Sequence, residues 1–294
     1  PIGKRQCPAH GYEDHRTGCP APRRHRQDAM GSGRNMELRS LGSNGPMVSP
    51  LSLGSTKFGR REGVKYPTDF ALPSDGQLAE LLALAKDTGI NLVDTAPAYG
   101  TAEARIGDLI GNDDHWRFAT KVGEEFVDGR SYYDFSPKAI RTSVERSRQR
   151  LRRDILDIVL LHLSDDETAI LNEGAAMATL MELQEKGLIG SVGASTKTVF
   201  AGLLAVSQCD LVMVTLNPAD QSQLPVIAAA RTSRKGILIK KPLDSGHHSD
   251  IGAALGASVL QPGVTSVVIG TIDKDHLAQN CTAVGQALAS IDGR

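Results

Sequence analysis

From residue 37 onward, short apolar runs alternate with helix-like stretches in a regular order. The apolar runs predict β-strands near residues 51–56, 91–95, 117–121, 155–162, 190–195, 211–216, 237–241 and 266–270. The intervening stretches predict helices near residues 75–88, 102–110, 137–152, 173–186, 197–207, 222–234, 250–260 and 274–289. Before them, residues 37–53 hold two short runs on either side of Asn44-Gly45, which is the pattern of a β-hairpin.

Eight successive strand–helix units favour a closed barrel. Residues 155–161 are apolar on both faces apart from Asp157, as expected of a parallel strand covered by helices. Ser136-Pro137 is a good helix start and Lys186-Gly187 a good helix stop. An open doubly wound sheet would need a Gly-x-Gly-x-x-Gly turn after its first strand, and the sequence has none there. We therefore expect an α/β protein with a (β/α)8 TIM barrel and an N-terminal β-hairpin.

The first 35 residues differ in composition from the rest. They contain no Leu, Val or Phe, and they carry seven Lys and Arg against three Asp and Glu. Such a segment cannot bury enough apolar surface to offset its ordering entropy. We expect a disordered N-terminal extension at residues 1–35 and a barrel at residues 36–294. Zinc binding is the alternative for the extension, but the spacing matches no paired ligand pattern, so no metal is predicted for Cys7, His10, His15 and Cys19.

Charge and composition narrow the classes of partner. The 294 residues hold 33 Lys and Arg against 34 Asp and Glu, a net charge of −1, which argues against a nucleic-acid or membrane-surface protein. No apolar run approaches the roughly 18 residues of a membrane span. Four cysteines are too few for a disulfide framework and favour a reducing compartment, so we predict the cytoplasm. The expected partner is a small-molecule substrate, and the oligomeric state is left open.

Polar residues fall at the ends of three neighbouring predicted strands. Asp94 ends the second strand, Lys121 the third and His162 the fourth, and Tyr99 follows in the loop after Asp94. In a barrel, side chains at the carboxyl ends of the strands converge on one face, where active sites form. One such residue alone is usually a solvated strand end, but their coincidence on neighbouring strands predicts an active site.

The motifs around these residues resemble those of the aldo-keto reductase superfamily. The segment Asp94-Thr95-Ala96-x-x-Tyr99-Gly100-x-Ala102-Glu103-x-x-Ile106-Gly107 is similar to its signature, and residues 118–123 and 160–162 are similar to two further blocks. Residues 193–196 resemble the block that binds the nicotinamide carboxamide. Residues 267–271, with 276–277 and 279–280, resemble the adenosine-phosphate block. The resemblance covers residues 37–294 and implies a short, bacterial-type member with an unrelated N-terminal extension.

The resemblance implies an NADPH-dependent oxidoreductase that transfers hydride to the carbonyl of an aldehyde or ketone, or oxidises an alcohol in reverse. Tyr99 would be the general acid, with its pKa lowered by Lys121, which pairs with Asp94. His162 would donate a hydrogen bond to the substrate oxygen. NADPH, with NADH also possible, would be bound by Ser55, Thr56, Ser195, Thr196, Asn217, Lys240, Gly270, Thr271, His276, Gln279 and Asn280.

The sequence departs from the family pattern around the cofactor. Met213 stands where the family often has Gln, and residues 216–218 lack the aromatic residue that commonly stacks on the nicotinamide. Gly270 and His276 stand where the family commonly has Lys and Arg for the 2′-phosphate, with Lys274 as a candidate second charge. We therefore expect NADPH to bind better than NADH by a small margin. The segment after Lys240 is short, which predicts an open substrate site.

Two other functions are compatible with the same fold. A cofactor-binding regulatory subunit with little turnover is one, but the intact set of four predicted catalytic residues argues against it. A Schiff-base lyase using Lys121 as nucleophile is the other, and it needs a neutral amine, which the adjacent Asp94 opposes. For Lys240, contact with the cofactor pyrophosphate and simple solvation both stay open.

Overall fold

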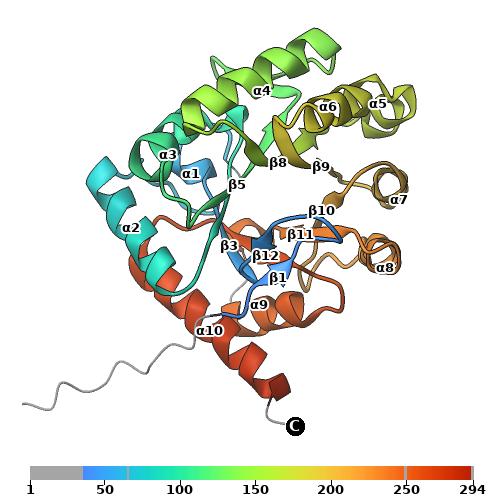
Figure 1. Cartoon of the computed structure of the whole chain (residues 1–294). Coiled ribbons are helices and arrows are strands. Elements are labelled where there is room, and N and C mark those ends of the chain that lie inside the picture. Colours follow the sequence, from blue (N-terminus) through green and yellow to red (C-terminus); the bar gives the residue numbers. More distant parts are fainter. Residues whose placement is uncertain (1–35, 65, 248–249, 293–294) are drawn as a thin grey trace, which may run out of the picture. The chain divides into compact units, whose positions relative to one another are not determined.

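The computed structural model describes residues 36–64, 66–247 and 250–292. The expected extension at residues 1–35, with its zinc alternative, lies outside the described residues. Eight parallel strands close into a barrel in which neighbours in space follow the order of the chain, and the last strand pairs with the first (Figure 1). They are β3 (Leu51–Gly54), β4 (Leu92–Asp94), β5 (Arg117–Val122), β8 (Leu156–His162), β9 (Ile189–Ser195), β10 (Leu211–Thr215), β11 (Gly236–Lys240) and β12 (Ser266–Ile269). The predicted (β/α)8 barrel is confirmed.

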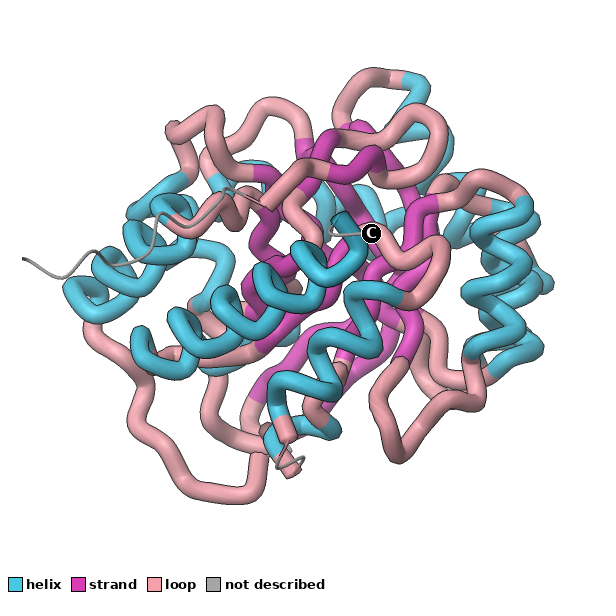
Figure 2. Tube along the Cα trace, turned by 90° about the horizontal axis from the view of Figure 1, so that it is seen from below, coloured by secondary structure: helices cyan, strands magenta, loops and turns pink. Residues whose placement is uncertain are grey.

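The helices lie outside the strands (Figure 2). They are α1 (Thr56–Gly59), α2 (Asp75–Asp87), α3 (Ala102–Ile110), α4 (Pro137–Leu151), α5 (Glu167–Glu173), α6 (Ala175–Glu185), α7 (Val199–Gln208), α8 (Leu224–Thr232), α9 (Ile251–Leu260) and α10 (Lys274–Asp292), with short 3-10 turns η1 (Pro97–Tyr99) and η2 (Asp244–Gly246). The helix predicted at 173–186 corresponds to α6, and a further helix, α5, precedes it; Gly174, with φ +72°, separates the two. Across the described ranges, no helix is both long and apolar enough to cross a bilayer.

Two antiparallel hairpins accompany the barrel. The predicted N-terminal hairpin pairs β1 (Arg39–Ser40) with β2 (Met47–Val48), and residues 41–46 form its loop. A second hairpin, β6 (Glu124–Val127) with β7 (Arg130–Tyr133), was not predicted. Asp128-Gly129 turns it with positive φ at both residues, 49° and 76°, which is the conformation that favours this dipeptide. The Asp-Gly pair was therefore the sequence signal that could have revealed this hairpin.

The apolar core has two layers, one inside the barrel and one between the strands and the helices. Along β8, Ile158 and Leu160 join the inner cluster, whereas Val159 and Leu161 join the outer one. This alternation follows from the two-residue period of a strand. Leu41 and Val48, from the N-terminal hairpin and its loop, belong to the same buried cluster as the inner strand residues. The interior is therefore packed with side chains, and an active site can form only at an end of the barrel.

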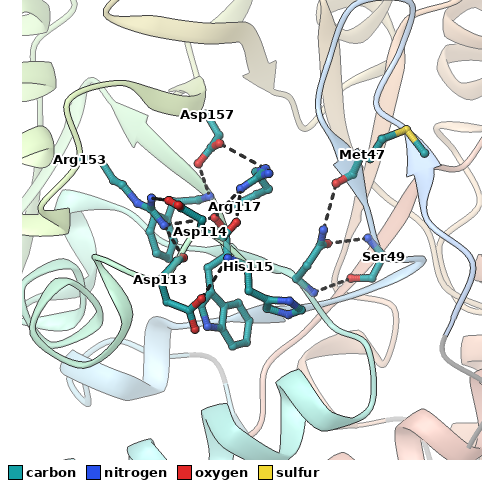
Figure 3. A network of polar contacts seen from close by, with 11 residues as sticks. Met47, Ser49, Asp113, Asp114, His115, Arg117, Arg153 and Asp157 are labelled. Atoms are coloured by element: carbon teal, nitrogen blue, oxygen red, sulfur yellow. Dashed lines mark hydrogen bonds and ion pairs between the residues drawn. The ribbon is translucent and has the colours of Figure 1, made fainter.

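Polar contacts tie together the amino ends of the strands (Figure 3). Ser49, before β3, donates its backbone N–H to Asn91 Oδ1 at 2.8 Å, just before β4. Asp157 of β8 accepts the backbone N–H of Phe118 of β5 at 2.9 Å. Arg153 donates to the carbonyl of Asp113 at 2.8 Å, so this end also binds the loop before β5. These bonds stabilise this end of the barrel, and the opposite rim, formed by the carboxyl ends of the strands, is the one where barrel active sites form.

The arginine-rich segment of α4 and its C-terminal end is neutralised within the protein. Each of its six arginines pairs with a carboxylate from α4 itself or from another segment; they are Arg141, Arg146, Arg148, Arg150, Arg152 and Arg153. Such ion pairs are typical of an outer barrel helix with a solvated face.

Candidate active site

Asp94 and Lys121 form a buried ion pair at the carboxyl rim. Asp94 ends β4, and Lys121 lies near the end of the adjacent strand β5. Lys121 Nζ donates to Asp94 Oδ1 at 2.7 Å and to the carbonyl of Thr95 at 2.8 Å. Burial acts to lower the pKa of Lys121, but the charge and hydrogen bond of Asp94 outweigh it, and the pKa is raised. The pair therefore holds Lys121 as an ammonium ion.

Tyr99 lies over this pair. It ends the 3-10 turn η1, and Lys121 Nζ is 4.8 Å from the centroid of its ring. Burial raises the pKa of Tyr99 by more than the charge of Lys121 and the contact with Thr56 lower it. The sequence analysis expected Lys121 to lower this pKa; its charge acts in that direction, but desolvation is the larger effect. The phenol is therefore protonated at neutral pH.

A close backbone approach fixes the turn that carries Tyr99. Gly100, the next residue, has φ +63°, and a Cβ atom there would collide with the carbonyl of Gly59 at the end of α1. The reverse also holds, since a Cβ at Gly59 would collide with the backbone N–H of Ala102. Glycine is thus required on both sides of the contact, and the contact sets the position of Tyr99 above Lys121.

His162 ends β8 and carries a partner that the sequence analysis missed. Its Nδ1 lies 2.8 Å from Oε2 of Glu124, the first residue of the β6–β7 hairpin. Ser131 of β7 donates to the other carboxylate oxygen at 2.6 Å. Burial alone would raise the pKa of Glu124, but the contacts with His162 and Ser131 and the charge of Arg60 lower it to about 2. The sequence analysis did not identify Glu124, because no recognised motif includes it and the hairpin that carries it was not predicted.

Three of the residues expected to bind the cofactor gather on this rim. Lys240, at the end of β11, donates to Ser195 Oγ, at the end of β9, at 2.9 Å. Burial lowers the pKa of Lys240 to about 7, with the charge of Lys241 acting in the same direction. Ser55, just after β3, has a buried hydroxyl without a hydrogen-bond partner in the described part of the chain. An unsatisfied buried hydroxyl and a largely buried amine at the carboxyl rim fit a site that binds a polar ligand such as a dinucleotide.

Three other expected cofactor residues have local roles. Thr56 begins α1 and lies beside the Tyr99 phenol. Thr196 has a buried hydroxyl near Gly202 of α7, so it lies toward the helix layer. Asn217 accepts the backbone N–H groups of residues 219 and 220 at 2.9 and 2.8 Å and donates to the carbonyl of Lys241 at 3.0 Å. Much of its side-chain hydrogen-bonding capacity therefore stabilises the loop after β10.

The remaining expected cofactor residues lie between β12 and the first turns of α10: Gly270, Thr271, His276, Gln279 and Asn280. Gly270, His276 and Gln279 are exposed, whereas Thr271 and Asn280 are buried. Asp273 already occupies the start of α10, because its carboxylate accepts the backbone N–H groups of residues 275 and 276 at 2.8 and 3.0 Å. Lys274 pairs with Glu80 of α2. A 2′-phosphate here would meet a carboxylate and a lysine that is already paired.

Comparisons with known proteins agree with this arrangement. A model of the Aldo/keto reductase family matches residues 50–231, more than half of the chain. A crystal structure from Pseudomonas aeruginosa, described as an aldo-keto reductase, is 46% identical and has a TM-score of 0.79, covering 85% of this chain and 96% of that one.

Two curated relatives are oxidoreductases by name. One is the uncharacterized oxidoreductase YqkF of Bacillus subtilis, 28% identical over 73% of this chain and 70% of the relative. The other is pyridoxine 4-dehydrogenase of Escherichia coli, 27% identical over 77% of this chain and 90% of the relative. With the family match and the barrel carrying the buried Asp94–Lys121 pair beneath Tyr99, these findings show that the chain belongs to the aldo/keto reductase family of NAD(P)H-dependent oxidoreductases.

Proposed function

We propose that the protein reduces the carbonyl of a small aldehyde or ketone, and oxidises the alcohol in reverse, with Tyr99 as the general acid. The observation that carries the proposal is the ammonium of Lys121 beneath a protonated phenol. A general acid must hold its proton until the reacting oxygen needs it and must then release it easily. Burial raises the pKa of Tyr99 and so keeps the proton in place, and the charge of Lys121 eases its release.

In the proposed reaction, each of the residues at the carboxyl rim has its own role. A bound nicotinamide cofactor supplies the hydride. Tyr99 gives its proton to the substrate oxygen, and the ammonium of Lys121 stabilises the phenolate that is left until solvent returns a proton. Asp94 keeps Lys121 charged, and His162 contacts the same substrate oxygen from β8. Ser55, Ser195 and Lys240 bind the nicotinamide half of the cofactor.

For the cofactor, we propose that NADPH binds better than NADH by a narrow margin. His276 and the start of α10 favour the 2′-phosphate. The carboxylate of Asp273 at the same helix end opposes it, and Lys274 is engaged by Glu80. We also propose that the substrate is a small molecule and, from the cysteine content, that the protein lies in the cytoplasm.

The lyase alternative is disfavoured by the raised pKa of Lys121, because a Schiff base needs a neutral amine. Trapping with borohydride in the presence of a carbonyl substrate would reveal it. A regulatory subunit is disfavoured by the pairing of all the acid–base groups at one rim. The deciding experiment is a screen of aldehydes and ketones with NADPH and with NADH, read by the loss of cofactor absorbance. Turnover that Tyr99→Phe abolishes supports the proposal, and no turnover with any carbonyl refutes it.

A further inference from the structure

Glu167 is a buried carboxylate that joins two loops of the carboxyl rim. It begins α5, in the connection that follows β8 and His162, and it is 2% exposed. Its Oε2 accepts the backbone N–H of Lys197 at 2.8 Å. Its Oε1 accepts the backbone N–H of Thr198 at 2.8 Å and the Thr198 hydroxyl at 2.5 Å. All three hydrogen bonds therefore hold the loop between β9 and α7.

The loop that Glu167 holds follows Ser195, the last residue of β9. Ser195 lies opposite His162 in the parallel register of β8 and β9, and its hydroxyl accepts a hydrogen bond from Lys240 Nζ at 2.9 Å. The next residue, Thr196, donates its backbone N–H to the carbonyl of Met213 on β10 at 3.1 Å. Residues 195–198 are thus held from three sides, by β10, by β11 and, through Glu167, by the connection after β8.

The position of this loop depends on the carboxylate of Glu167. The amine of Lys197 does not bind that carboxylate but pairs with Asp165 at 2.7 Å. An ionised carboxylate loses its hydration on burial, and hydrogen bonds from the protein must replace it. Here the backbone of residues 197 and 198 supplies two of them, so moving either partner would leave a buried charge or a buried N–H unsatisfied.

We infer that Glu167 is a positioning residue, which fixes residues 195–198 so that Ser195 lies where the nicotinamide end of the cofactor binds, beside His162. The inference rests on the proposed function in one respect, that Ser195 binds the nicotinamide half. Glu167 acts through the loop, because its oxygens are engaged by residues 197 and 198 and its side chain is covered. Loss of its carboxylate should therefore weaken binding of the nicotinamide end and leave the adenosine end, at the start of α10, unchanged.

The test compares two ligands that differ in the nicotinamide alone. Titration calorimetry on the full chain gives Kd for NADPH and for 2′-phospho-ADP-ribose, which is the same molecule without the nicotinamide ring. In Glu167→Gln an amide NH2 replaces one accepting oxygen, so one N–H of the loop loses its acceptor. NADPH should bind about three- to tenfold more weakly, the range of one hydrogen bond, and 2′-phospho-ADP-ribose should bind within about twofold of the wild type. Glu173→Gln, at the exposed end of the same helix, is the matched control and should change neither constant.

Glu167→Asp is the second variant, because it keeps the charge and both oxygens and so tests the inference even if the Gln variant does not fold. Its carboxylate is shorter by one methylene, so it should weaken NADPH binding and spare 2′-phospho-ADP-ribose in the same way. Wild-type affinity for NADPH, or an equal loss for both ligands, overturns the inference in whichever variant folds. Failure of the proposed function is a separate result. If NADPH binding responds as expected while the wild type turns over no carbonyl, the positioning role stands and the proposed reduction falls.

Discussion

The rings of Tyr99 and His162 meet edge to face at the carboxyl rim, with centroids 6.1 Å apart and planes at 89°. The two side chains come from different parts of the barrel, η1 after β4 and the end of β8. Each has its own charged partner, Lys121 below Tyr99 and Glu124 beside His162. A substitution at one of the two rings can therefore leave the charged partner of the other in place.

Replacing Tyr99 with Phe keeps the ring and removes the proton donor. General acid catalysis is worth about 10²- to 10⁴-fold, so carbonyl reduction should fall by at least that much. Cofactor affinity should barely change, because the phenol does not bind the dinucleotide in this proposal. The measurements are kcat and the Kd of NADPH, with Tyr132→Phe on the exposed strand β7 as control. A variant that keeps most of its turnover would remove Tyr99 from its assigned role.

Asp94→Asn leaves Lys121 buried without its carboxylate. Breaking a buried pair on one side costs about 3–5 kcal/mol, so the melting temperature should drop clearly. The wild-type pKa of Lys121 is raised, so the stability that the pair contributes is complete below the ordinary lysine pKa and is lost only at higher pH. The deficit of the variant should therefore be present throughout the neutral range. Asp69→Asn is the control, because its ion pair with Arg61 is exposed and worth little; an equal loss in both variants would contradict the prediction.

Lys240 should make the binding of oxidised cofactor depend on pH. Its pKa of about 7 makes it a cation at pH 6 and mostly neutral at pH 8. If it lies beside the nicotinamide, as its bond to Ser195 suggests, its charge repels the positively charged ring of NADP⁺ and not that of NADPH. The ratio of the Kd of NADP⁺ to that of NADPH should fall about three- to tenfold from pH 6 to 8, on the order of 1 kcal/mol.

Lys240→Met should remove this trend and tighten NADP⁺ binding at pH 6. Lys186→Met, whose exposed amine lies at the end of α6, is the control and should leave the trend in place. Titration of intrinsic or cofactor fluorescence at the two pH values gives all four constants. A ratio that does not move with pH in the wild type would place Lys240 away from the nicotinamide.

The preference for NADPH over NADH should narrow in His276→Ala. In the proposal His276, in the first turn of α10, contacts the 2′-phosphate that NADH lacks. Asp273→Asn should widen the preference, since it removes a negative charge from the start of α10. The measurements are the dissociation constants of both cofactors for the wild type and the two variants. If His276→Ala keeps the wild-type preference, another residue contacts the phosphate.

The barrel was predictable because its strands are apolar on both faces. The run at residues 155–161 had to be covered on each side, and eight such units with intervening helices leave few arrangements other than a closed barrel. The predicted residues Asp94, Lys121 and His162 also lie at strand ends as expected. Strand ends follow directly from sequence periodicity, so their convergence can be expected without knowing any side-chain contact.

The missed features depend on contacts between distant segments. The hairpin that carries Glu124 is mostly polar and exposed along β7, so no apolar pattern marks it. The net pKa of Tyr99 depends on burial by the surrounding fold, whereas the sequence suggested only the charge of Lys121. Likewise, the pairing of Lys274 joins the last helix to Glu80 on α2 across 194 positions of the chain. These effects can be described only from the folded structure, because they depend on contacts between residues far apart in the chain.

The β6–β7 hairpin contributes no strand to the barrel. The hairpin follows Gly123, where φ is +101° and a side chain would collide with the ring of Phe135. It ends just before α4 begins. The ten residues from Glu124 to Tyr133 are thus an attachment rather than part of the framework. The barrel strands thus supply Asp94, Lys121 and His162, whereas the attachment supplies Glu124, which lies beside His162. A change in the sequence of this hairpin would therefore alter the surroundings of His162 and leave every barrel strand untouched.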